Sequence, residues 1–262
     1  MSARRGAAPL AAYVLHQHDW SETSLIVELF TRERGRVVVA AKGAKRPYSQ
    51  LRAVLLPFQR INAQLGRTPA DEAAEVHLLR GAEWAGGLPM PAGAALLAGF
   101  YINELLLKLL ARQDAHPALF DFYADTLAAL TAADEGARQA ALRAFELMLL
   151  RELGVLPELD VVTQTVTPVQ PQARYGLDAE AGVVTTAAEP ALSGAALVAL
   201  EAALEHGSGA ALRQAVAPVT AALRPLLRAL LHYHLGSALR TRQVMVDVHK
   251  LIEPAVRTRP TR

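Results

Sequence analysis

The sequence contains no cysteine at all, and this absence limits the chemistry that the chain can perform. It excludes disulfides, thiolate nucleophiles and zinc or iron–sulfur centres held by cysteine. Long apolar runs are missing as well: the stretch AGAALLAGFYI at 92–102 is too short, and too soon followed by charge, to span a bilayer. The N-terminus has no signal-peptide pattern, so we expect a cytoplasmic protein with no membrane partner.

Two short motifs that would indicate an enzyme are also absent. The segment AAKGAKR has a glycine and lysines but lacks the Walker A spacing that wraps a phosphate. The segment HGSGA at 206–210 lies between two helical patterns, where its glycines serve as a cap and a turn and not as a nucleophile elbow. Neither segment predicts catalysis.

Charge is distributed unevenly along the 262 residues, although the net charge is only +2. Residues 1–60 hold ten basic and four acidic residues, a net of +6. Residues 61–212 hold eight against nineteen (−11), and residues 213–262 hold nine against two (+7). Two basic ends around an acidic middle favour an anionic polymer as partner. The alternative is surface charge that serves solubility alone.

The first 84 residues have the pattern of short β-strands. Alternating or β-branched runs occupy 11–18, 23–30, 36–43, 57–65 and 74–84, and the second and third are joined by a short turn that ends in Gly35. A small sheet of this kind avoids exposed edges by closing on itself. We therefore predict a five-stranded OB-fold barrel over 1–84.

A helical domain is predicted after the breaker cluster AGGLPMP at 85–91. Helical periodicity covers about 96–110, a helix that opens at Pro117, then 137–153, 193–205, 210–235 with a kink near Pro225, and 237–250. The segment 157–190 loses this period and suggests an inserted hairpin. The whole is an α+β protein, with a helical domain over 90–250 and a basic flexible tail over 251–262.

A basic loop follows the third strand, in the stretch GRVVVAAKGAKRPYSQLR at 35–52. Long cations beside a barrel can neutralise backbone phosphates, and an aromatic ring can stack on a base. The residues predicted to bind DNA here are Arg34, Arg36, Lys42, Lys45, Arg46, Tyr48 and Arg52. The alternative is a solvated hairpin with ordinary surface lysines.

Histidine pairs are the remaining candidates for metal ligands. His16 and His18 share one face of a strand with Asp19 nearby, but no third ligand is evident. His232 and His234 lie two apart on a helix and so point in different directions. We predict no metal site.

The order of several motifs resembles the RecO family of bacterial recombination mediators. The motifs are YVLHQHDWSETSLIVELFTRERGRVVVAAKGAKR, LLPFQRI, RGAEW, YINELL, LRAFELMLLRELG and a late LRTRQVM. The resemblance covers nearly the whole chain and implies an OB-fold followed by a helical domain. It also implies binding to single- and double-stranded DNA, strand annealing, and work with RecR, with the single-strand-binding protein SSB and with the RecA recombinase. No cofactor and no catalysis are implied, and a cytoplasmic, nucleoid-associated location would follow.

The resemblance also bears on three finer points. Many family members carry a four-cysteine zinc module where this chain has TQTVTPVQPQARYGLDAEAGVVTT, so a metal-free hairpin is predicted here. The acidic C-terminal tail of SSB docks on the helical domain in this family, and Arg143 and Arg151 are the rim residues we predict for it. Arg240 and Arg242 of the last helix are further candidates for DNA contact.

Two other classes of function stay open at this stage. A DNA-processing enzyme, such as a nuclease or glycosylase, would need a carboxylate or histidine metal site or a catalytic residue in a pocket. A protein-interaction scaffold would carry its basic ends incidentally. Strand scission with magnesium would indicate the first, and the absence of DNA binding would indicate the second.

Overall fold

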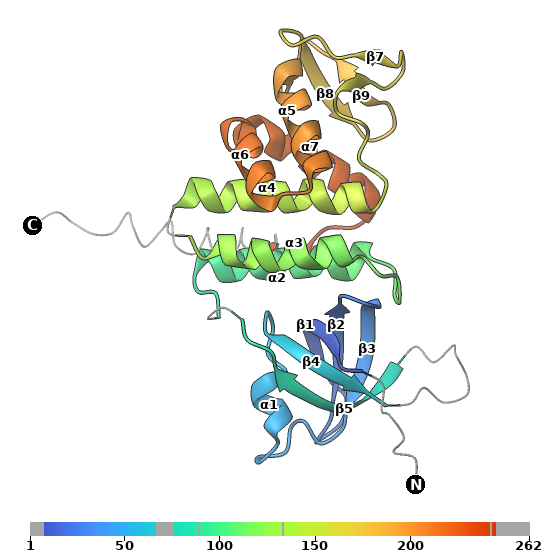
Figure 1. Cartoon of the computed structure of the whole chain (residues 1–262), viewed down its shortest axis with the longest axis vertical. Coiled ribbons are helices and arrows are strands. Elements are labelled where there is room, and N and C mark those ends of the chain that lie inside the picture. Colours follow the sequence, from blue (N-terminus) through green and yellow to red (C-terminus); the bar gives the residue numbers. More distant parts are fainter. Residues whose placement is uncertain (1–7, 67–75, 88–89, 133, 242, 245–262) are drawn as a thin grey trace, which may run out of the picture.

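The structure is a computed structural model that describes residues 8–66, 76–87, 90–132, 134–241 and 243–244. Figure 1 shows a β-barrel at one end of the molecule, a layer of long helices across the middle, and small sheets at the far end beyond shorter helices. Within the described ranges, no helix is long and apolar enough to cross a membrane.

Five strands of the described chain close into the barrel. They are β1 (Leu10–Asp19), β2 (Leu25–Thr31), β3 (Gly35–Ala41), β4 (Arg60–Leu65) and β5 (Val76–Trp84), in the order β1-β2-β3-β5-β4. All neighbours are antiparallel except β3 and β5. Alternate side chains such as Val27, Val39 and Ile61 fill the interior. The predicted OB-fold barrel is confirmed.

A short helix, α1 (Gln50–Val54), covers one end of this barrel, where the sequence suggested only a loop. Leu55 just after it is buried in the barrel core, and Leu51 and Val54 pack against that core. Their spacing of three and four residues places them on one side of a helical turn. The apolar signal was therefore present in the sequence beside the more prominent basic residues.

Three long helices form the middle layer and share a core with barrel-domain residues outside the barrel interior, among them Tyr13 and Phe30. They are α2 (Ala94–Leu109), α3 (Pro117–Leu130) and α4 (Glu135–Glu152), close to the predicted positions. Phe30 of β2 packs on Phe120 of α3 at a ring distance of 5.4 Å. Asn103 of α2 is buried, donates to the backbone oxygen of Leu15 at 2.9 Å and accepts from Tyr123 at 2.6 Å. Apolar packing and a satisfied polar contact thus fix the barrel to the helices.

The C-terminal half adds small sheets and three further helices. The strands are β6 (Val161–Val162), β7 (Thr167–Pro168), β8 (Arg174–Asp178), β9 (Gly182–Thr185) and β10 (Leu192–Ser193), and the helices are α5 (Gly194–His206), α6 (Gly209–Val216) and α7 (Thr220–Leu235). β8 and β9 pair as the predicted hairpin, and β10 adds to β8. Of the helix expected over 237–250, residues 240–241 and 243–244 are helical, and residues 242 and 245–250 lie outside the described residues.

The helix predicted as continuous over 210–235 is two helices, and the predicted kink is at the wrong proline. A 3₁₀ turn at Ala217–Val219 contains Pro218 and separates α6 from α7. Pro225 lies inside α7 instead. Leu223 and Leu227 beside it are completely buried, so packing outweighs the one backbone hydrogen bond that proline removes.

A threonine joins two of the small sheets through its backbone and its side chain. The Thr163 hydroxyl accepts from the Val183 backbone at 2.8 Å, and the Thr163 backbone donates to the Val183 oxygen at 3.1 Å. Gly182 is required beside it, because its φ is 73° and an added Cβ would lie 2.2 Å from the Thr163 hydroxyl oxygen. Ordinary hydrogen bonds hold this hairpin in place.

We expect Thr163→Ala to lower the free energy of unfolding by about 1–3 kcal/mol, because the Val183 N–H would lose its acceptor in a part-buried place. Thr163→Ser keeps the hydroxyl and is the matched control. Thermal unfolding of both variants measures the effect, and equal stability of Thr163→Ala and the parent would contradict it.

Chelation is expected to leave both the melting temperature and DNA binding unchanged, because the chain has no cysteine to hold zinc. Thermal unfolding with and without a strong chelator checks this. A clear fall in melting temperature would direct attention to His16 and His18, whose rings lie 4.3 Å apart.

Candidate nucleic-acid interface

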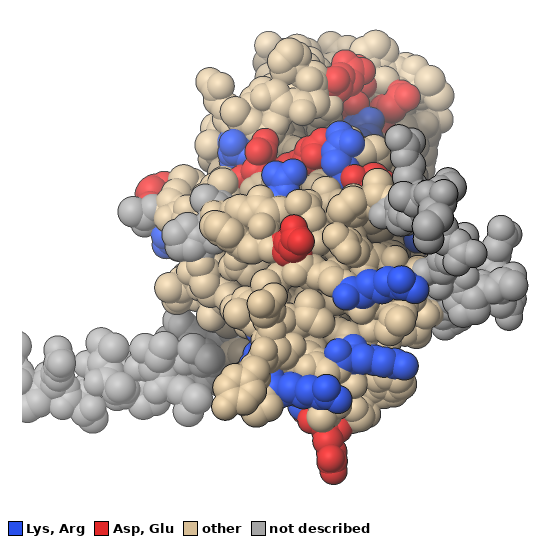
Figure 2. Space-filling model, turned by 60° about the horizontal axis from the view of Figure 1, so that its bottom comes forward, with Lys and Arg blue, Asp and Glu red and all other residues tan. Residues whose placement is uncertain are grey.

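The basic loop lies at the barrel end that points away from the helices (Figure 1). Lys42, Arg46 and Arg52 are exposed, and the Tyr48 side chain is 99% exposed. Figure 2 brings this end of the molecule forward and shows Lys and Arg side chains gathered on it. Arg52 reaches this surface from α1 and not from a loop.

Tight turns fix the backbone of this segment. Gly43 has a φ of 72°, a left-handed conformation that glycine adopts without strain. Arg46 N donates to the Gly43 oxygen at 3.1 Å, and Ser49 N donates to the Arg46 oxygen at 3.0 Å. Ala44 is completely buried between the exposed cations. The cations therefore extend from an anchored turn, which reduces the entropy lost on binding.

Lys45 differs from the other loop cations because it is bound to the neighbouring β1–β2 turn. Its ammonium donates to the Ser21 oxygen at 3.0 Å and lies 3.2 Å from the Asp19 carboxylate. Its backbone N donates to the Thr23 oxygen at 2.9 Å. Lys45 thus joins two turns, and its charge is partly neutralised.

Arg34 and Arg36 lie at the opposite end of the barrel, facing the helices. Arg36 donates to the backbone oxygen of Leu107 in α2, and burial lowers the pKa of Arg36 from its usual range. Arg34 is 3.5 Å from the Gln113 side chain. The structure therefore does not bring these two arginines together with the basic loop, and we leave them out of the proposed DNA surface.

Arg240 lies on a third part of the molecule. Its backbone N and that of Thr241 donate to the Glu104 carboxylate of α2 at 2.8 and 2.9 Å, while the Arg240 residue is exposed. Arg242 lies outside the described residues.

His16 and His18 were the candidate metal ligands of the barrel. Burial and the neighbouring His18 lower the pKa of His16, and Arg240 adds to this effect. Among the residues that the structure describes, no group of three or more His, Asp or Glu is placed to hold a metal.

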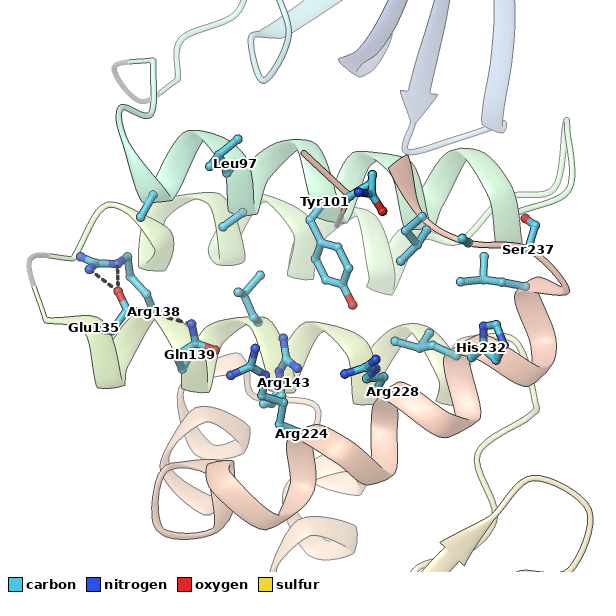
Figure 3. A pocket seen from close by; sticks show the side chains of 18 residues that line it. Leu97, Tyr101, Glu135, Arg138, Gln139, Arg143, Arg224, Arg228, His232 and Ser237 are labelled. Atoms are coloured by element: carbon cyan, nitrogen blue, oxygen red, sulfur yellow. Dashed lines mark hydrogen bonds and ion pairs between the residues drawn. The ribbon is translucent and has the colours of Figure 1, made fainter. Parts of the chain in front are cut away.

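A cavity of about 580 Å³ opens between α2, α4, α7 and residues 237–243. Leu97, Tyr101 and Leu142 contribute apolar surface. Figure 3 shows Arg143, Arg224 and Arg228 close together opposite Tyr101. The basic side chains that line the cavity are Arg138, Arg143, Arg224, Arg228 and His232.

Two residues that line this cavity, Tyr101 and Arg143, belong to a buried ionic group. Arg143 pairs with Glu146 at 2.8 Å, and Tyr101 donates to the same carboxylate at 2.6 Å. Burial raises the pKa of Glu146, although Arg143 and Tyr101 oppose this effect. The positive charge of Arg143 is thus partly compensated by Glu146. Arg224 and Arg228, by contrast, are exposed at the cavity.

Arg151, predicted together with Arg143, does not line the cavity. It pairs with Glu201 of α5 at 2.6 Å, and the same carboxylate accepts from Leu159 N at 2.8 Å. Arg224 and Arg228 were overlooked in the sequence, and His232 was considered only as a metal ligand. Their spacing of four residues on one helix was the available signal, because it places them on one face.

The barrel and its exposed cationic end define the class: an OB-fold protein with an appended helical domain. Family sequence profiles agree with this division. The profile described as Recombination protein O N terminal matches residues 9–84, and Recombination protein O C terminal matches residues 90–243.

Individual relatives extend over nearly the whole chain. A DNA repair protein RecO from Acidovorax ebreus (strain TPSY) is 51% identical over 266 residues, which covers 96% of this chain and 100% of the relative. The protein of that name from Variovorax paradoxus (strain S110) is 51% identical, and that from Delftia acidovorans (strain DSM 14801 / SPH-1) is 47% identical, each with the same coverage. This chain belongs to the RecO family of DNA repair proteins.

Proposed function

We propose that this protein binds single-stranded DNA and anneals complementary strands as a recombination mediator, and that it also binds duplex DNA. The observation that carries the proposal is the anchored turn at the free end of the barrel, with three exposed cations and one fully exposed tyrosine. Cations neutralise phosphates and an aromatic ring stacks on bases, which together bind a single strand without reading its sequence.

The second half of the proposal concerns protein partners. The cavity between α2, α4 and α7 combines apolar walls with clustered arginines. An acidic peptide with an apolar end complements both features, and the acidic C-terminal tail of SSB is the partner that we propose for it. RecR would join the complex, and RecA would be loaded on the exposed strand.

A division of labour follows from this assignment. Residues 1–84 would bind DNA and residues 90–250 would bind partners, with the basic segment 251–262 lying outside the described residues. We propose no catalytic step for the protein itself, so ATP hydrolysis would belong to RecA. The present protein would act in the cytoplasm, on the chromosome.

Annealing of complementary SSB-coated oligonucleotides without ATP tests the proposal. We expect faster formation of labelled duplex than with SSB alone. Folded protein that does not accelerate annealing would count against a mediator. Scission of labelled DNA with magnesium would instead indicate a nuclease, and absence of DNA binding would indicate an interaction scaffold.

Tyr48→Ala is expected to weaken binding to single strands by about 1–3 kcal/mol, the range for one lost base stack. The dependence of affinity on salt should hardly change, because no phosphate contact is removed. Salt titrations with labelled oligonucleotides measure both quantities. Tyr48→Phe keeps the ring and should bind like the parent; a loss equal to that of alanine would contradict stacking.

A further inference from the structure

An exposed tryptophan lies in the turn next to the basic loop. Trp20 follows β1 directly, and the residue is 56% exposed. Tryptophan combines a large apolar ring with a polar N–H and is enriched at binding interfaces. The basic loop and Tyr48 do not account for it, so Trp20 requires its own explanation.

The turn that holds Trp20 is anchored from two sides. Trp20 N and Ser21 N both donate to the Ser24 oxygen, at 3.2 and 3.3 Å. Lys45 ties the same turn to the basic loop through Ser21 and Asp19. Gly43 N, at 3.4 Å from the Ser24 hydroxyl, adds a further contact between the two segments. The position of Trp20 relative to the loop cations is thereby fixed.

The charges around Trp20 indicate what it would bind. Lys42, Arg46 and Arg52 are exposed at this barrel end and outnumber the exposed acids Asp19 and Glu22 that flank Trp20. An apolar protein partner would require a wider apolar surface. A flat ring can stack on an unpaired base, while cations beside it neutralise the backbone phosphates of the same strand. Duplex DNA keeps its bases stacked inside and would leave the ring without a partner.

We infer that Trp20 is a second stacking residue for the bases of single-stranded nucleic acid, and that Lys45 is a positioning residue that holds the Trp20 turn against the loop. The inference rests on the proposed binding of single strands and names a residue that carries it. Bases would contact Trp20 and Tyr48, while the phosphates would contact Lys42, Arg46 and Arg52.

Fluorescence can report on this contact directly, because the chain has only two tryptophans, Trp20 and Trp84. Trp84 lies at the end of β5, where its ring donates to Gln59 at 3.1 Å. A Trp84→Phe variant leaves Trp20 as the sole tryptophan. We expect oligothymidylate to quench its emission, and an abasic strand of equal length to leave the emission largely unchanged. The Trp20→Phe variant, which reports Trp84, is the matched control and should show little quenching.

Affinity provides an independent readout. Trp20→Ala should weaken binding to oligothymidylate by about 5- to 150-fold, the range for one lost stack, with an unchanged salt slope. It should not weaken binding to the abasic strand, and Trp20→Phe should restore most of the affinity. If Trp20→Ala binds oligothymidylate as tightly as the parent, or loses as much affinity for abasic strands, the inference about Trp20 is wrong while the proposed function stands. A parent protein that fails to bind any single strand would overturn the proposed function as well.

Discussion

Replacing Lys42, Arg46 and Arg52 together by alanine is expected to weaken binding to all single strands and to make its salt dependence shallower. Each phosphate contact on a single strand contributes about 0.7 to the slope of log affinity against log salt, so three lost contacts should reduce it by about 2. Lys45 is not included, because its ammonium is already paired with Asp19. Affinity should fall alike for every sequence, because phosphate contacts carry no sequence information.

The measurement is a salt titration of the parent and variant with labelled oligonucleotides of different sequence. A matched control exchanges the same three residues for the other basic type, Lys42→Arg, Arg46→Lys and Arg52→Lys, which keeps the charge and should keep the slope. Thermal unfolding should hardly change, because exposed charges contribute little to stability. An unchanged slope in the alanine variant would mean that the loop is ordinary solvated surface, and Arg240 and Arg242 would become the leading candidates.

The second large effect is expected at the cavity. Arg224→Ala combined with Arg228→Ala should reduce affinity for an acidic peptide with an apolar C-terminal residue by about 100-fold or more. The estimate takes about 1.5–3 kcal/mol for each hydrogen bond to a charged group. The reason is that both arginines are exposed at the cavity and can reach carboxylates of a bound peptide.

Arg143 is a poorer choice for this test. Its removal would leave the completely buried Glu146 without its ion-pair partner, and such changes destabilise proteins by about 3–5 kcal/mol. A loss of peptide binding would then be confused with unfolding. Arg224 and Arg228 avoid this difficulty.

The two sets of variants serve as controls for each other. Fluorescence anisotropy with a labelled peptide should show the loss only in the Arg224/Arg228 variant, and oligonucleotide titrations should show it only in the loop variant. Loss of peptide binding in both would indicate a general charge effect and not a defined pocket. Parent-like peptide binding in the Arg224/Arg228 variant would contradict the assignment of the cavity.

Much of the architecture was predictable because its signals are local. Alternation in segments such as 11–18 and β-branched or aromatic residues in 23–30 predict strands, and apolar spacing of three and four residues predicts helices. The confusion of Pro218 with Pro225 as the helix break shows the limit of such signals. Both prolines disfavour helix, and only burial of the leucines around Pro225 allows the helix to continue there.

The sequence by itself determined the OB-fold barrel, the helical domain, the β8–β9 hairpin and the basic character of the loop after β3. The tertiary structure alone decided which cations are available. Lys45, Arg36 and Arg151 look like the other basic residues in sequence, yet they are engaged by Asp19, Leu107 and Glu201.

The same distinction applies to the cavity, where Arg143 of α4 meets Arg224 and Arg228 of α7. Secondary structure follows from interactions between residues a few positions apart, which a sequence pattern records. Ion pairs and cavities join residues from distant segments, and their geometry is fixed only when the shared core packs.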